Sequence, residues 1–186
     1  MKDMKITILV SVLISLVFLV PDRIQLWAYQ TVLVQQDEWW RFFTAVFVHL
    51  DLLHLVRNLG IFLIVGSSLE RKLGSLQYIM LILVSGIMNN VFAWLSGIPD
   101  PFIGLSGVIF AIIIVLFLEL LVKERSEASM LGILMVLIFI DQRIYHVSGV
   151  ISGIGFFYIK QTFNFLKIHI KGMIHVRTKK GRSISA

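Results

Sequence analysis

The sequence predicts an all-α, polytopic membrane protein built as a bundle of six transmembrane helices. Of its 186 residues, 58% are hydrophobic and 15% are charged, with a mean hydropathy of +0.89. A soluble domain is about half apolar and about a quarter charged. The charged residues also gather in short turns between apolar runs that are long enough to cross a bilayer. We expect a membrane domain over residues 1–166 and a basic cytoplasmic tail over residues 167–186.

Six apolar runs follow one another, each ended by a polar or helix-breaking cluster. The first run ends at Pro21 without a small-x-small cleavage site, so we expect a retained helix and not a cleaved signal peptide. In the amphipathic linker that follows, Trp27 and Tyr29 suit a membrane interface. The fifth run is close to the shortest that can cross a bilayer. The expected spans are residues 5–20, 42–67, 76–95, 104–122, 129–140 and 144–166.

Lys and Arg are unequally distributed between the two sides of this predicted bundle. An even number of spans places both termini on one side, and that side holds 13 of the 17 basic residues. The other side holds only Arg23, Arg41 and Arg143, while Arg57 lies within a span. The positive-inside rule therefore predicts that both termini lie in the cytoplasm. We expect a multi-pass protein of a bacterial-type plasma membrane. The basic tail fits this topology beside the lipid bilayer, and we expect no nucleic-acid partner.

The composition also restricts the chemistry. The chain has no cysteine, which excludes disulfides, thiolate catalysis and cysteine-based zinc sites. Neither a glycine-rich phosphate loop nor a dinucleotide fingerprint is present, and we expect no cofactor. Polar groups inside apolar spans are energetically costly, so those that occur are the first candidates for function.

A single hydroxyl lies between two glycines where the fourth run begins, in Gly104-Leu105-Ser106-Gly107. Ser106 has two readings. It is a small residue that lets helices pack closely, or it is a nucleophile at a helix start, where free N–H groups and the helix dipole favour an oxyanion. The motif alone does not decide between them. The topology places this residue near the outer face of the membrane.

Two residues of the second run share one helical face. His54 and Asn58 are four residues apart and so about 40° apart around a helix. They are suitable donors toward one oxygen, or an interhelical hydrogen-bonded pair. His49 precedes His54 by five residues, about 140° around a continuous helix, whereas zinc helices use an i, i+4 spacing. We therefore expect no metal site and read His49 as a satisfied structural histidine.

The sixth run offers a base. His146 is followed by Gly149 and Gly153, which line one helical face and allow another helix to approach closely. If that helix is the fourth span, the imidazole reaches Ser106 and can take its proton. The alternative is a glycine packing seam with an incidental histidine. Asp141 is the nearest acid in sequence, and a Ser–His dyad is a more economical reading than a triad.

Taken together, these motifs resemble those of the rhomboid intramembrane serine proteases. The resemblance covers roughly residues 40–153, most of the chain, with the motifs in order and on the predicted spans. The matching motifs are Trp40-Arg41, His49-x4-His54-x3-Asn58, Glu70-x3-Gly74-Ser75, Gly104-x-Ser106-Gly107 and His146-x2-Gly149-x3-Gly153.

The resemblance implies a six-helix bundle with a water-accessible cavity open to the outer face, which cleaves transmembrane protein substrates near the outer ends of their helices. It implies that Ser106 is the nucleophile and His146 the general base. The backbone N–H of Ser106 and the side chains of His54 and Asn58 would form the oxyanion hole. Phe110 matches an aromatic position that packs on the imidazole. The other residues of the matching motifs would support this site.

Two alternatives stay open at this point. A catalytically silent rhomboid-like protein would bind transmembrane clients, although loss of Ser106 or His146 would be expected in it. A small transporter or channel subunit would spread its polar residues over the membrane depth, whereas here they cluster at one level. Arg57 departs from the family pattern, and its side chain can snorkel outward or pair with Asp51 or a substrate acid. The sequence does not define an oligomeric state.

Overall fold

The computed structural model describes residues 4–97, 101–123, 132 and 147–182, and divides into two compact units, Met1–Ile154 and Gly155–Ala186. Within the described residues every regular element is helical, apart from one isolated bridge between Tyr29 and Phe102. The predicted all-α class is confirmed for this part of the chain. That the chain crosses the membrane six times stays a prediction. Most of the expected fifth span, residues 129–140, lies outside the described residues, and so do Asp141 and His146.

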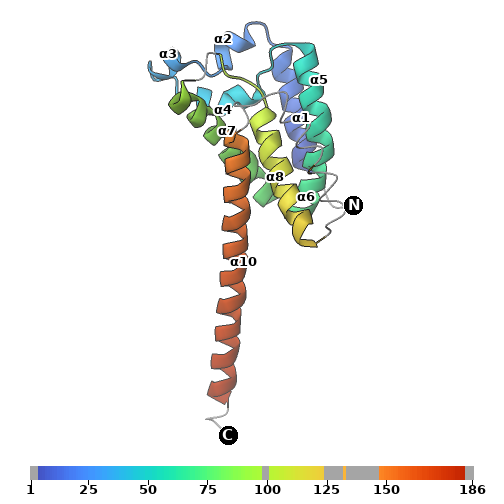
Figure 1. The fold of residues 1–186 in the computed structure, drawn as a ribbon, viewed down its shortest axis with the longest axis vertical. Helices are drawn as coiled ribbons and strands as arrows, with labels where there is room; N and C mark the ends of the chain where they lie inside the picture. Colours follow the sequence, from blue (N-terminus) through green and yellow to red (C-terminus); the bar gives the residue numbers. More distant parts are fainter. Residues whose placement is uncertain (1–3, 98–100, 124–131, 133–146, 183–186) are drawn as a thin grey trace. The chain divides into compact units, whose positions relative to one another are not determined.

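The first unit holds most of the helices. They are α1 (Lys5–Phe18), α2 (Arg23–Trp27), α3 (Thr31–Val34), α4 (Arg41–Thr44), the 3₁₀ helix η1 (Ala45–Phe47), α5 (Leu52–Ile61), the π helix η2 (Phe62–Gly66), α6 (Ser67–Leu73), α7 (Ser75–Ser96) and α8 (Ser106–Lys123), followed by α10 (Val147–Arg182), which continues into the second unit. Figure 1 shows α1 and α7 running toward the end at which α2, α3 and α4 lie, and α5 and α8 running away from it.

Within the part of the chain that the structure describes, two helices are long and apolar enough to cross a membrane by length and composition. They are α7 and the continuous helix Leu52–Leu73, which α5, η2 and α6 form together. The helices Lys5–Phe18 and Ser106–Val122 are apolar but shorter. Within the expected span of residues 42–67, the continuous helix begins only at Leu52. The cause is local, because the Asp51 carboxylate accepts the His54 N–H at 2.7 Å and so caps the helix start.

A buried carboxylate joins the start of α1 to α6. Glu70 is 1% exposed and accepts hydrogen bonds from the backbone N–H groups of Ile6 (3.0 Å) and Thr7 (2.9 Å) and from the Thr7 hydroxyl (2.7 Å). These N–H groups belong to the first turn of a helix and lack helical partners, so a negative charge there is favourable. Gly74, with φ +79°, then allows the chain to turn directly into α7.

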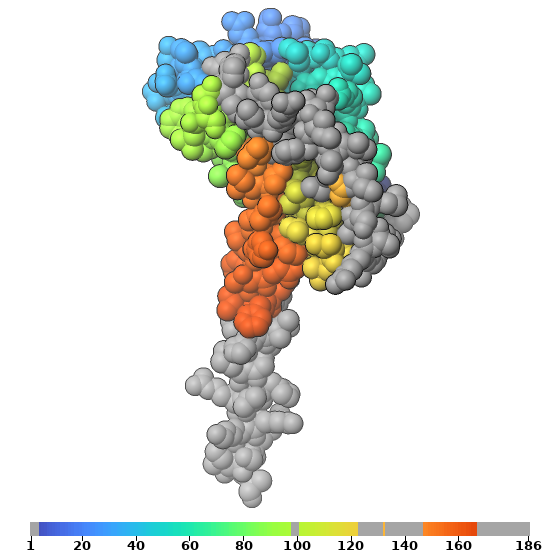
Figure 2. All heavy atoms as spheres, in the orientation of Figure 1, coloured from blue at the N-terminus to red at the C-terminus, as the bar shows by residue number. Residues whose placement is uncertain are grey.

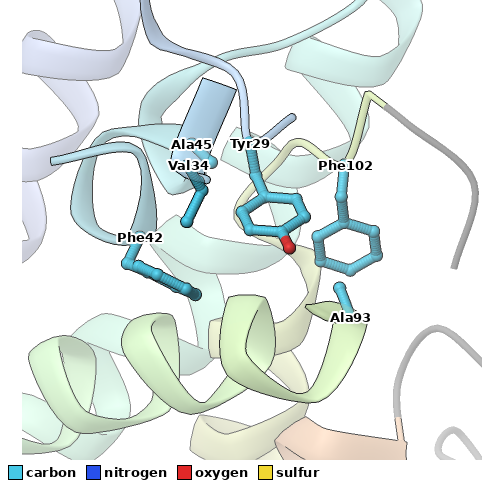
Figure 3. Close-up of a cluster of buried hydrophobic side chains, with 6 residues drawn as sticks. All are labelled: Tyr29, Val34, Phe42, Ala45, Ala93 and Phe102. Atoms are coloured by element: carbon cyan, nitrogen blue, oxygen red, sulfur yellow. The ribbon is translucent and has the colours of Figure 1, made fainter. Parts of the chain in front are cut away.

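The linker between α1 and α5 has a small hydrophobic core of its own (Figure 3). Tyr29 is fully buried, not at an interface, because its backbone exchanges two hydrogen bonds with Phe102 and its ring packs 5.5 Å from that of Phe42. The cluster consists of Tyr29, Val34, Phe42, Ala45, Ala93 and Phe102. It fixes the linker to α7 and to the chain that leads into α8.

The linker also packs against the last turns of α7 through a polar contact. The Asn90 amide donates to the carbonyl of Phe42 at 2.8 Å, and the Thr44 hydroxyl donates to the carbonyl of Trp27 at 2.8 Å. In Figure 2 the blue residues of α2–α4 and the green residues of α7 lie side by side at this end of the first unit. The end that begins α5 and α8 is therefore held in place by the linker.

Candidate active site

The candidate site lies where α5 and α8 begin, at the end of the first unit that carries the linker (Figure 1). Ser106 is the first residue of α8 and is half-buried. Gly104 precedes it with φ +102°, a backbone conformation that only glycine adopts readily. The N–H of Gly104 donates to the carbonyl of Ala45 at 3.0 Å, so η1 fixes the turn that presents the serine.

The turn before Ser106 lies directly on His54 and Asn58. A Cβ added to Gly104 would lie 2.9 Å from Cε1 and Nε2 of His54 and 3.6 Å from Nδ2 of Asn58. These two side chains thus point from one face of α5 toward the backbone that leads into α8. The structure thus brings together two motifs that are far apart in the sequence, with His54 and Asn58 beside the turn that precedes Ser106.

His49 orients the Asn58 amide. Its Nε2 lies 3.0 Å from Asn58 Nδ2, its Nδ1 lies 3.4 Å from the carbonyl oxygen of Phe47, and its side chain is fully buried. Because the amide nitrogen only donates, Nε2 accepts and the ring proton is on Nδ1, facing Phe47. One amide N–H of Asn58 therefore bonds His49, and the same nitrogen carries a second N–H.

The expectation that His49 and His54 point apart assumed one helix through both residues. The structure differs, because His49 lies in the non-helical residues 48–51 and its ring is 4.9 Å from that of His54. Among the described residues, no group of three or more His, Cys, Asp or Glu side chains is arranged to hold a metal. Arg57 lies on the exposed face of α5, next to the buried Asn58.

The first two turns of α10 pack tightly on α8. A Cβ added to Gly149 would overlap the Gly107 carbonyl oxygen and lie 2.9 Å from Cβ of Phe110, and one added to Gly153 would lie 2.8 Å from the Ala111 carbonyl oxygen. Phe110 is buried. His146, the expected base, immediately precedes α10 in sequence and lies outside the described residues.

Two supporting motifs lie away from the serine turn. Arg41 is buried and donates to the carboxylate of Glu38 (2.6 Å) and to the carbonyls of Ala28 (2.7 Å) and Gln25 (2.9 Å), so it braces the linker. Its neighbour Trp40 is half-exposed at 50%. Glu70 belongs to α6, near the end of the first unit where α1 starts, and its contacts are with α1. Arg41 and Glu70 are thus parts of the scaffold.

Sequence reasoning did not single out two polar contacts near the site. The buried Ser148 of α10 donates to Oδ1 of the buried Asn89 on α7, and Asn89 also fills the space beside Gly107. Arg23 donates to the carbonyls of His49 and Leu50. Because Asn89 lies within a predicted span, its polar amide could have marked it as a candidate functional residue. For Arg23 the only signal was its place in the count of basic residues on each side of the membrane.

Several known proteins and one domain model are similar in sequence to this chain. A Rhomboid domain model matches residues 36–161. Rhomboid protease GlpG of Haemophilus influenzae is 35% identical over 122 residues, which cover 62% of this chain and 62% of that protein. Rhomboid protease GluP of Bacillus subtilis is 29% identical over 132 residues, covering 65% of this chain and 26% of that protein.

RHOMBOID-like protein 1 of Arabidopsis thaliana is 27% identical over 110 residues, covering 59% of this chain and 28% of that protein. The chain therefore spans less than two thirds of the length of these relatives. Together with the apolar helices, this similarity supports an integral membrane protein. Because the matched domain covers more than half of the sequence, the chain belongs to the rhomboid family.

Proposed function

We propose that this chain is an intramembrane serine endopeptidase that hydrolyses peptide bonds in or near the transmembrane segments of other membrane proteins. The observation that carries the proposal is the contact of the Gly104 backbone with His54 and Asn58. Two side chains that can donate hydrogen bonds thus lie beside the turn that precedes Ser106, which supports the proposal. The names of the GlpG and GluP relatives, both called rhomboid proteases, support the class of reaction.

The proposed chemistry is acyl transfer through a dyad. The Ser106 oxygen attacks the scissile carbonyl carbon while His146 takes the hydroxyl proton. His146 then gives this proton to the departing amine as the C–N bond breaks, which leaves an ester on Ser106. Water attacks the ester with the same base, and the carboxylic acid product departs as the serine is restored. No cofactor takes part in these steps.

The oxyanion of each tetrahedral intermediate would be held by three donors. The Ser106 N–H belongs to the first turn of α8, where helical partners are lacking and the dipole favours negative charge. Asn58 offers the N–H that His49 does not use. His54 supplies an imidazole donor beside it. Donors fixed in an apolar surrounding need no reorganisation as charge develops, which is why they lower the barrier.

The proposal includes six spans, with both termini in the cytoplasm of a bacterial-type cell and the site near the outer face. The basic residues of the first unit support this topology. Lys5, Arg71, Lys72 and Lys123 all lie at helix ends opposite the end that holds Ser106 (Figure 1). A substrate helix hides its carbonyls in its own hydrogen bonds, so the scissile segment must become extended before it is cut.

A covalent probe tests this function directly. We expect a fluorophosphonate to label the purified protein, and Ser106→Ala to abolish both labelling and cleavage of a model transmembrane substrate. Wild-type protein that stays unlabelled and leaves the substrate uncut would favour the catalytically silent, client-binding alternative. Retention of both Ser106 and His146 argues against that alternative.

The donors have their own test. His54→Ala or Asn58→Ala should lower turnover by about 10- to 1000-fold, the range found for one oxyanion donor. Labelling by the fluorophosphonate should slow in parallel, because the probe passes through a similar charged state. Turnover that stays unchanged in both variants would return these residues to a structural role in the helix bundle.

A further inference from the structure

Arg23 links three elements at the outer end of the first unit. It is the first residue of α2, separated from the end of α1 by residues 19–22, and its side chain is half-buried. The guanidinium lies 4.3 Å from the ring centre of Phe18, the final residue of α1. Its Nε donates to the carbonyl of His49 at 3.1 Å, and its Nη2 donates to the carbonyl of Leu50 at 3.0 Å. One planar group thus binds two consecutive carbonyls.

Those carbonyls belong to the non-helical segment that leads into α5. Residues 48–50 come before the Asp51 cap, and the helical bonds of α5 begin only at the Asp51 carbonyl, which accepts the Leu55 N–H at 3.0 Å. Carbonyls at an apolar boundary need partners, because each unsatisfied one costs free energy. The rigid fork of an arginine can serve both at once, whereas a lysine ammonium is a point donor.

The same segment carries the side chain that orients Asn58. His49 bonds Asn58 through Nε2 at 3.0 Å and lies in ring contact with His54. The position of the imidazole follows that of its own backbone, which Arg23 holds by the carbonyl. A continuous path of hydrogen bonds therefore runs from Arg23 through His49 to the amide of Asn58.

We propose that Arg23 is a positioning residue that sets the orientation of the Asn58 amide through His49. The inference rests on the proposed function for its catalytic consequence, since Asn58 acts there as an oxyanion donor. Arg23 would affect the rate of the chemical step without touching the substrate. A simple topology charge or interface anchor at this position would behave differently, because lysine would replace it fully.

The test is a set of kinetic measurements on the purified full chain with a model transmembrane substrate. We expect Arg23→Gln to lower kcat roughly 10-fold with KM within about twofold, since a misplaced donor weakens only the transition state. Arg23→Lys should fail to restore kcat. The matched control is Arg71→Gln, the same substitution on the exposed side of α6, which should leave kcat unchanged.

A double substitution separates positioning from general destabilisation. If Arg23 acts through Asn58, then Arg23→Gln should have little further effect on kcat in an Asn58→Ala background. An equal loss of kcat in both backgrounds, or full activity of Arg23→Lys, would overturn the proposal. Either result would leave the proposed protease function intact, because the wild type would still cleave.

Hydrogen–deuterium exchange tests the inference independently of activity. Arg23→Gln should speed amide exchange in residues 48–58 relative to α7, while Arg71→Gln should not. Unchanged exchange in residues 48–58 would refute the positioning role even if the wild type proved inactive. An inactive, unlabelled wild type with faster exchange in Arg23→Gln would instead refute the protease function and retain the contact path from Arg23 to Asn58.

Discussion

Gly104→Ala tests whether the close contact between the serine turn and the α5 donors matters for chemistry. The glycine has φ +102°, and the added methyl carbon would lie 2.9 Å from two ring atoms of His54. Ordinary contacts of this kind begin at 3.4 Å. The His54 ring or the turn must therefore move by at least about 0.5 Å, directly between Ser106 and the side chains proposed as oxyanion donors.

Two effects follow, and they have different magnitudes. Strain at a positive φ should lower the free energy of unfolding by about 1–3 kcal/mol. Displacement of the donors should lower kcat by about 10- to 100-fold, because misplacement by about 1 Å costs about 100-fold. The first effect is a loss of folded protein, and the second remains when the rate is divided by the folded fraction.

The control is Gly97→Ala. Gly97 also has a positive φ, +61°, at the end of α7, but no described atom lies within 4 Å of an added Cβ. It should lower the thermal unfolding temperature while preserving turnover per folded molecule. Cleavage of a model transmembrane substrate and the rate of fluorophosphonate labelling would be measured for both variants. If Gly104→Ala keeps the turnover of Gly97→Ala, the contact with His54 has no catalytic role.

Three further predictions concern the scaffold and use thermal unfolding in detergent. Glu70→Gln should lower the free energy of unfolding by about 1–3 kcal/mol through weakened capping of α1, and unchanged stability would contradict this role. Gly149→Val should destabilise the protein and abolish cleavage, because the valine side chain would overlap α8. The control Gly155→Val should do neither, since no described atom lies within 4 Å of a Cβ added there. Asn89→Ala should lower the free energy of unfolding by about 1–3 kcal/mol, because it leaves the Ser148 hydroxyl unpaired. The double variant with Ser148→Ala should recover part of this free energy. No recovery would refute the pairing.

Periodicity and composition were sufficient to predict the helical class and to predict that His54 and Asn58 share one helical face. The four-residue spacing of His54 and Asn58 placed them on one side of a helix, and the structure has them together against Gly104. The position of His49 could not be obtained in this way, since the angle between two residues is defined only inside a helix. Asp51 was the available signal, because an aspartate three residues before the bonded N–H is a common helix cap.

Contacts that use backbone carbonyls were beyond reach of the sequence. Every residue has a carbonyl, so nothing in the letters indicates that Arg23 would bind those of His49 and Leu50. Tyr29 shows the same limit, since its burial depends on a two-bond bridge to Phe102, which is distant in the chain. For Asn89 the residue type pointed to a buried partner, but one sequence does not say which of several hydroxyls that partner is.

Because of the π helix η2, polar residues near both ends of the continuous helix Leu52–Leu73 point into the protein. In a uniform α-helix, Asn58 and Glu70 would be 12 positions and hence about 120° apart, so one of them would turn to lipid. The wider turn of Phe62–Gly66 absorbs about one extra residue, which reduces this angle to about 20°. Both side chains are indeed sheltered, at 7% and 1% exposure. Converting η2 into a regular α-helix of the same length would restore the angle of about 120° and rotate Glu70, which anchors α1, away from the helical face that carries Asn58.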